Sequence, residues 1–376
     1  MAAVVPLPNV PKLPRWPRTR WSEFLLVGGA TLPLLLVAWI LQRTLDLDET
    51  EYTVSYVAFY LAFVINDPHF AVTYFLFYRD AKRRALSPSL PLTQRLRYWA
   101  AGALAPLLLL GWSAFALHRR DAEAIGAMVQ VMFLLVGWHY VKQGFGMVTV
   151  LSARRGVALT ALERRALLTH CYAGWAYAWA SPASAAARYV EKGVVYTSFA
   201  HPRWLELTTA IVFGMSTGVL LGVLGYKLWR ERARFPFAPV VGFLITIWAW
   251  TIWSAWDPLL RYFIPALHSI QYLYFVWLMR KNEARSKEGP PAFGRPVRTV
   301  LGVLALASLA LGWVLFHGLP TFLDDAFTKR ASEDTPMGPT PYFAALFVFV
   351  NVHHYCMDSV IWRRDNPDTR FLKDPQ

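Results

Sequence analysis

The chain has 376 residues, of which 56% are hydrophobic and only 16% are charged, and its net charge is +14. The charged fraction lies well below the roughly 25% that is typical of soluble domains. Apolar runs of about 20 residues recur along most of the length. These features predict a polytopic membrane protein. They argue against a soluble enzyme and against a nucleic-acid-binding domain, because excess Lys and Arg in a membrane protein mark its cytoplasmic loops.

The apolar runs predict ten membrane helices, each long enough to cross a hydrocarbon layer of about 30 Å. In chain order they span residues 23–42, 53–78, 97–117, 124–151, 162–182, 206–229, 236–256, 257–280, 297–317 and 339–362. The predicted fold is an all-α, polytopic helical bundle. It forms one transmembrane domain over residues 23–362, between a basic, proline-rich tail (1–22) and a short second tail (363–376).

Charged residues in the connections predict the orientation. If the N-terminus is cytoplasmic, most of the 38 Lys and Arg residues fall in cytoplasmic connections, and the opposite side carries the acidic stretches 46–51 and 323–334. This asymmetry places both termini in the cytoplasm. We expect a multi-pass protein of a bacterial plasma membrane. Its expected partners are the lipid bilayer and a lipophilic small molecule, not a nucleic acid.

Four of the nine histidines lie at a similar depth in different helices. The second, fourth, eighth and tenth predicted helices run in the same direction and carry His69, His139, His268 and His354. At 1.5 Å per residue, the four agree within about 8 Å of depth. Polar side chains persist in a membrane where they face the bundle interior and have partners. Several converging imidazoles predict a transition-metal site.

Further polar residues lie near these histidines on the same helices. They are Asn66 near His69, Lys142 and Gln143 near His139, Tyr272 near His268, and Asn351 and Asp358 near His354. We expect Asn66, Gln143 and Asn351 to help bind the cofactor by orienting the imidazole rings. The catalytic candidates are Lys142, Tyr272 and Asp358, which can assist proton transfer.

Two adjacent histidines in the tenth helix leave the choice of ligand open. His354 shares a helix face with Asn351 and Asp358, whereas His353 shares one with apolar residues. This pattern favours His354. In a tilted helix both rings could still reach one site, so both are candidate ligands.

The segments "PHFAVTY", "HYVKQGFG", "HSIQYLYF" and "HHYCMD" occur in the order of four histidine motifs that the Brp/Blh family carries on successive membrane helices. The chain therefore resembles this family of membrane β-carotene 15,15'-dioxygenases. The resemblance implies a single iron bound by histidines. The motif positions fall on His69, His139, His268 and His353, with His354 next to it.

The motifs also differ from those of the family. Thr73 stands where the first family motif has an acid, and Tyr272 stands where the third has a second histidine. In the last motif, the spacing to Asp358 favours His353 over His354. The family motif therefore favours His353 as the ligand, whereas the helix face favours His354.

Together these features predict a membrane-embedded, mononuclear, non-haem iron oxygenase or oxidoreductase that acts on an isoprenoid or another lipid. Two alternatives stay open. One is a b-type haem protein that exchanges electrons with quinone, with two histidine pairs as axial ligands. The other is a transporter or assembly subunit in which the histidines and Lys142 relay protons.

Overall fold

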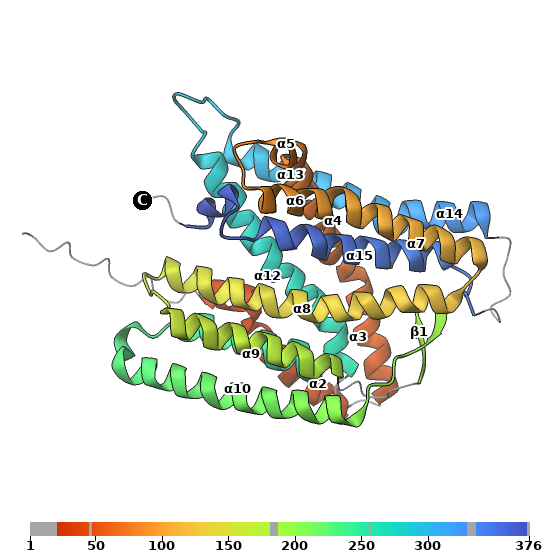
Figure 1. Ribbon diagram of the computed structural model, residues 1–376, viewed down its shortest axis with the longest axis horizontal. Helices are drawn as coiled ribbons and strands as arrows, with labels where there is room; N and C mark the ends of the chain where they lie inside the picture. Colours follow the sequence, from red (N-terminus) through yellow and green to blue (C-terminus); the bar gives the residue numbers. More distant parts are fainter. Residues whose placement is uncertain (1–20, 45–46, 181–186, 256–257, 329–335, 374–376) are drawn as a thin grey trace, which may run out of the picture.

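Helices account for nearly all of the computed structural model, which describes residues 21–44, 47–180, 187–255, 258–328 and 336–373. Most of them lie side by side along the long axis of the molecule, and α12 crosses this direction obliquely (Figure 1). The predicted all-α class is confirmed. Most of the predicted basic tail and the last three residues lie outside the described ranges, as do parts of the predicted acidic stretches.

Helix covers nearly all described residues of the ten predicted segments, with a turn at Ala30 inside the first. The long helices are α2 (Thr31–Thr44), α3 (Leu47–Leu61), α4 (Asp67–Tyr78), α7 (Ala105–Arg119), α8 (Ala122–Arg154), α9 (Ala161–Ala180), α10 (Arg203–Arg230), α12 (Pro258–Arg285), α13 (Val297–Trp313) and α15 (Pro341–Ile361). Shorter helices extend or connect them: α1 (Trp21–Phe24), η1 (Leu25–Gly29), η2 (Ala62–Asn66), α5 (Ala81–Leu86), α6 (Leu92–Trp99), η3 (Ala100–Leu104), η4 (Arg232–Arg234), α11 (Phe237–Ile245), η5 (Thr246–Ile252), η6 (Trp253–Ala255), η7 (Val314–Gly318), α14 (Leu319–Phe327) and η8 (Pro367–Leu372).

Among the described residues, five helical stretches are long and apolar enough to cross a membrane. They are Leu92–Arg119, Ala122–Arg154, Arg203–Arg230, Val297–Phe327 and Pro341–Ile361. The pair Trp21–Gly29 and Thr31–Thr44, which is bent by 63°, adds a sixth if it forms one span. The chain therefore has the helices of a membrane protein. The figure of ten crossings and the orientation of the termini stay predictions.

The helices differ in how much of their surface lies inside the bundle. Most of α15 is buried, and it packs against α4, α7 and α8. In contrast, α10 exposes large apolar side chains such as Leu207, Ile211 and Met215. An exposed apolar helix face is what a lipid-facing helix requires, since lipid tails are as apolar as these side chains.

A break in the first apolar segment connects the N-terminal region to the interior. Gly28 has a φ of 124°, a left-handed conformation that glycine adopts without a steric penalty. The carbonyl oxygen of Val27 is thereby free of the helix and accepts a hydrogen bond of 2.7 Å from Gln271 of α12. This bend therefore brings η1 against the polar face of α12.

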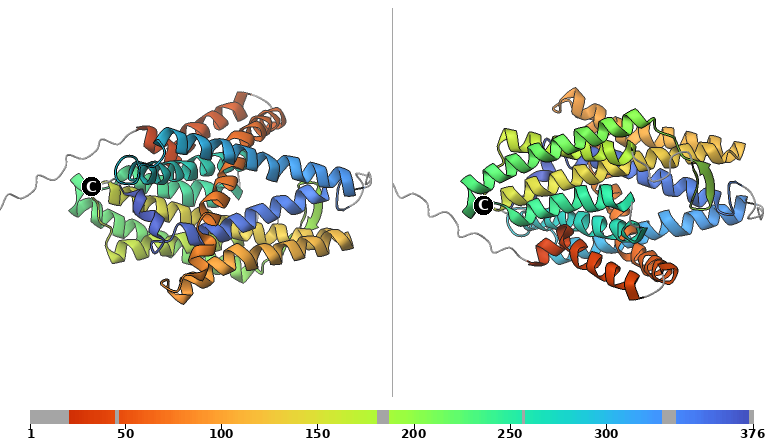
Figure 2. Two further views of the ribbon diagram at one scale, coloured as in Figure 1. Left: turned by 90° about the horizontal axis from the view of Figure 1, so that it is seen from above. Right: turned by 90° about the horizontal axis from the view of Figure 1, so that it is seen from below.

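A β-hairpin is the one feature of the described residues that the all-α prediction omits. Strands β1 (Arg188–Glu191) and β2 (Val194–Thr197) are antiparallel, and Lys192 and Gly193 form the turn with φ of 51° and 85°. Positive φ at both positions is typical of a type I′ turn. The hairpin lies at the same end of the bundle as α14 (Figures 1 and 2).

Candidate metal centre

Four histidines from four helices meet in the interior of the bundle. One ring nitrogen from each residue lies within 4.8 Å of those from the others, and the residues are His69 of α4, His139 of α8, His268 of α12 and His354 of α15. All four side chains are buried. The Nε2 atoms of His139 and His268 are 3.2 Å apart. The prediction that these four helices bring imidazoles to one centre is confirmed.

Several of these ring nitrogens have no hydrogen-bond partner among the described residues. They include Nε2 of His69, Nδ1 of His268 and both ring nitrogens of His354. A buried polar atom without a partner costs about 1–3 kcal/mol. Neutral imidazoles with lone pairs directed at a common point are good ligands for transition metals. The set of donors therefore fits a bound metal ion better than a purely structural cluster.

Asp358 adds a carboxylate to the four imidazoles. Its Oδ2 atom lies 3.3 Å from Nε2 of His354 and 3.7 Å from Nε2 of His139, and it has no hydrogen-bond partner among the described residues. Its other oxygen, Oδ1, accepts a hydrogen bond of 2.7 Å from Tyr272. One oxygen of Asp358 is thus held by the protein, and the other faces the histidines.

A relay of hydrogen bonds fixes the orientation of His69. Asn66 accepts a bond of 3.0 Å from the hydroxyl group of Ser269, whose oxygen lies 3.1 Å from Nδ1 of His69. Since the Ser269 proton is donated to Asn66, the Ser269 oxygen accepts the proton on His69 Nδ1. In that tautomer Nε2 carries the lone pair and faces the centre. Asn66 therefore acts on His69 through Ser269, as an orienting residue.

Gln143 supports the same region from α8. Its side-chain nitrogen donates to the carbonyl oxygen of His268 at 3.2 Å and to Gln271 at 2.7 Å. Gln271 in turn donates to the Val27 carbonyl at the break in the first segment. This chain of bonds connects α8, α12 and the N-terminal segment around the histidine centre.

Tyr272 and Thr73, two of the positions at which the chain differs from the family motifs, contact each other. The Tyr272 hydroxyl oxygen lies 2.7 Å from Oγ1 of Thr73 and donates its proton to Asp358. Thr73 lies one turn after His69 on α4, and its hydroxyl group is also within 3.2 Å of the His69 carbonyl oxygen. The hydroxyl groups of Thr73 and Tyr272 thus form one polar cluster that supports Asp358.

Asn351 makes its hydrogen bonds with groups other than the four histidine rings. It donates to the carbonyl oxygen of Phe347 and accepts a bond of 3.1 Å from Tyr355. The Tyr355 ring is tilted beside His139, with ring centroids 4.9 Å apart. Asn351 therefore contacts the centre through an aromatic side chain.

His353 and Lys142 do not join the centre. His353 has its own partners, with Nδ1 3.1 Å from the Tyr74 hydroxyl group and Nε2 3.0 Å from the Ala101 carbonyl oxygen. His354 is therefore the member of this pair that lies in the cluster, as the helix-face pattern predicted, and its role as a metal ligand stays a prediction. Lys142 is half-buried beside two aromatic rings, with Nζ 5.5 Å from the ring of Phe145 and 5.8 Å from that of Tyr172.

Sequence reasoning did not identify Ser269, a small hydroxyl residue in an apolar helix that does not stand out in the sequence. Thr73 was noted only as a difference from the family motif, without a role at the site. Tyr140 and Phe70 form part of the wall, with ring centroids 4.5 Å from His268 and 4.7 Å from His354. The one signal for Tyr140 and Phe70 was their position next to a histidine in the chain.

No protein-family model, curated protein or solved structure matches this chain. The resemblance to the Brp/Blh motifs therefore stays a prediction that rests on the four short segments.

Proposed function

We propose that this protein is a membrane-embedded oxidoreductase that binds one iron ion and acts with dioxygen on an isoprenoid or another lipophilic substrate. One observation carries the proposal. Four buried histidines on four different helices place ring nitrogens within 4.8 Å of one another. The residues that would bind the ion are His69, His139, His268 and His354, together with Asp358.

The number and kind of donors favour iron over a structural zinc ion. Structural zinc sites almost always have four ligands in tetrahedral geometry. Here four imidazoles and the unpartnered oxygen of Asp358 offer five donors. Iron accepts imidazole and carboxylate ligands and can keep a further position open. When bound, it supplies the redox chemistry that activates dioxygen.

A haem group fits this arrangement poorly. Two axial nitrogens on opposite sides of a metal lie roughly 4 Å apart at ordinary metal–nitrogen distances. The Nε2 atoms of His139 and His268 are 3.2 Å apart, closer than an axial pair. His69 and His354 fill further positions around the same point, where a porphyrin ring would have to lie. The geometry therefore supports a non-haem centre.

The surrounding residues suggest how protons are handled. Tyr272 donates its hydroxyl hydrogen bond to Asp358 and lies 2.7 Å from the Thr73 hydroxyl group, so these two residues hold a carboxylate that can accept a proton at its other oxygen. Ser269 and Asn66 keep the His69 lone pair directed at the ion. The position of Lys142 beside Phe145 and Tyr172 gives no support for its direct role in the reaction.

We also propose ten membrane crossings with both termini in the cytoplasm of a bacterial cell. Helix occupies nearly all described residues of the ten predicted segments. Single-cysteine labelling in intact cells tests the topology. A cysteine in the β1–β2 hairpin should react from outside, and one in the 286–296 connection should not. The reverse pattern would contradict the orientation.

Metal analysis tests the central proposal. The full chain is purified in an uncharged detergent without chelators, and its bound metals are measured together with its absorption spectrum. We expect about one iron per chain and no Soret band. The iron-loaded protein is then incubated with β-carotene in micelles while dioxygen uptake is followed. Folded protein that binds no iron after reconstitution would contradict the metal centre, and iron-loaded protein without dioxygen uptake would contradict this choice of substrate.

A further inference from the structure

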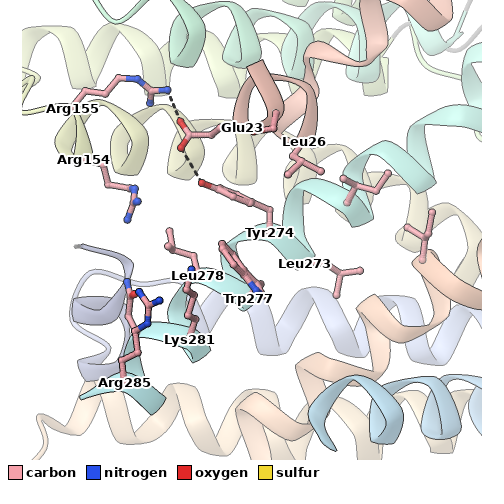
Figure 3. Close-up of a pocket in the computed structure, with 14 residues that line it drawn as sticks. Glu23, Leu26, Arg154, Arg155, Leu273, Tyr274, Trp277, Leu278, Lys281 and Arg285 are labelled. Carbon is pink, nitrogen blue, oxygen red and sulfur yellow. Dashed lines mark hydrogen bonds and ion pairs between the residues drawn. The ribbon is translucent and has the colours of Figure 1, made fainter. Parts of the chain in front are cut away.

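A cavity of about 820 Å³ opens beside the cytoplasmic half of α12, as oriented above, and is separate from the histidine centre. Its walls come from the N-terminal segment, η2, the end of α8 and the second half of α12 (Figure 3). The lining residues that carry the argument are Leu26, Ile65, Arg154, Leu273, Lys281 and Arg285.

One end of this cavity is strongly basic. Four cationic side chains line it, and they are Arg154, Arg155, Lys281 and Arg285. The only carboxylate among the lining residues is Glu23, which is paired with Arg155 and accepts a hydrogen bond of 2.9 Å from Tyr274. In Figure 3, the Glu23 carboxylate lies between Arg155 and Tyr274, with Lys281 and Arg285 further along the cavity. The basic end therefore carries a net positive charge.

Arg285 is the residue best suited to bind an anion from solution or from a head group. It is exposed, and no hydrogen bond or ion pair within the described residues involves its side chain. Lys281 lies one turn before it on α12, with Nζ 4.2 Å from the ring of Trp277. An arginine can bind phosphate through two parallel hydrogen bonds, and nearby cations strengthen that contact.

The other end of the cavity is apolar. Leu26 and Leu273 line it, and Trp277 lies between this end and the cations (Figure 3). Both Leu26 and Trp277 are exposed, at 40% and 43%. Tryptophan is enriched at membrane–water interfaces, where one side of the ring is apolar and the other is wet. Cations above an apolar wall match a ligand with an anionic head and a hydrocarbon chain.

We propose that this cavity binds a lipid phosphate, with the phosphate held by Arg154, Lys281 and Arg285 and the chain lying against Leu26 and Leu273. Phosphate is favoured over a carboxylate because several cations converge on one space, and a phosphate offers more oxygens and more charge. Two residues that line the cavity, Ile65 and Ile270, are adjacent in the chain to Asn66 and Ser269, which orient His69. The binding itself does not depend on the metal.

Binding to the full chain in an uncharged detergent tests the proposal. Native mass spectrometry or calorimetry measures the affinity for three probes: didecanoyl phosphatidate, didecanoyl phosphatidylcholine and inorganic phosphate. We expect phosphatidate to occupy one site at least about tenfold more tightly than either of the other probes, because it alone offers both an unshielded phosphate and a chain.

Variants separate the head-group and chain contacts. Arg285→Gln and Lys281→Gln should each weaken phosphatidate binding by about tenfold. Leu26→Gln should weaken it by several-fold without changing binding of inorganic phosphate. Arg234→Gln on η4 is the matched control, because Arg234 is exposed and does not line the cavity. It should leave all affinities unchanged. Thermal unfolding checks that each variant is folded, which is expected for Arg285→Gln since no contact of its side chain is lost.

Two outcomes would overturn the proposal. If phosphatidate and phosphatidylcholine bind equally, and Arg285→Gln and Lys281→Gln change neither, the cavity takes bilayer lipid without recognising its head group. If inorganic phosphate binds as tightly as phosphatidate and Leu26→Gln has no effect, the site is a free-anion site. Neither outcome bears on the iron content of the protein, so the two proposals fail independently.

Discussion

Two neighbouring histidines on α15 have opposite environments, although both are buried. His353 lies beside the Tyr74 hydroxyl group and the Ala101 carbonyl oxygen. Both ring nitrogens of His354 lack a hydrogen-bond partner among the described residues, and the ring lies with His69, His139 and His268. Burial alone therefore does not identify a ligand in this bundle. What separates the two is whether protein groups already satisfy the ring nitrogens.

The largest expected effect is a fall in thermal stability when the metal is removed, and this fall should depend on His354. If a bound ion satisfies the unpartnered nitrogens, chelation leaves them buried without partners. At free metal about 1,000 times its dissociation constant, binding stabilises the folded state by about 4 kcal/mol. We expect chelation to lower the unfolding temperature of the wild-type protein and of His353→Gln. In His354→Gln the chelator should change the unfolding temperature little. An equal fall in His353→Gln and His354→Gln would mean that the two histidines do not differ in their relation to the metal.

The next largest effect is expected on metal affinity when a proposed ligand is substituted. His354→Gln removes a proposed ligand and should lower metal affinity by more than about 100-fold, the upper range for residues that only support a ligand. His353→Gln is the matched control, because it changes the same side chain one position away. Its metal content, measured by elemental analysis, should equal that of the wild type. Similar metal loss in both variants would mean that the structure does not distinguish His353 from His354 as the ligand.

A smaller effect is expected for the hydroxyl groups that hold histidines in place. Ser269→Ala removes the group that fixes the His69 tautomer and should weaken metal binding by about 10-fold to 100-fold. Ser216→Ala is the control, since the Ser216 hydroxyl group lies 3.1 Å from Nδ1 of His170, outside the centre. Metal titrations of both variants compare the two serines. Equal affinities would mean that Ser269 does not orient a ligand.

The smallest effect on the metal is expected from Lys142→Met. Lys142 lies against the rings of Phe145 and Tyr172, so its loss should leave metal affinity unchanged. It should lower the free energy of unfolding by about 1 kcal/mol through the lost cation–π contacts. Metal titration and denaturant unfolding measure the two quantities. A clear fall in metal affinity would show that Lys142 reaches the centre, as the sequence allowed.

Much of the helical framework could be predicted because apolar runs and helical periodicity are local properties of the chain. The stripe of Asn351, His354 and Asp358 on one face of α15 correctly predicted which histidine points inward. The spacing in the family motif pointed to His353, since a motif records distances along the chain but not the direction of a side chain. The hairpin was missed because strands of four residues give little periodic signal.

The sequence by itself determined that this is a helical membrane protein with histidines at a common depth, since hydropathy and a fixed rise per residue suffice for both inferences. Only the tertiary structure decided which groups meet. Ser269 and His69 are 200 positions apart in the chain, and Thr73 and Tyr272 are 199 apart. The basic cavity combines residues from the N-terminal segment, α8 and α12. Such contacts depend on the packing of distant helices, for which a single sequence gives no local rule.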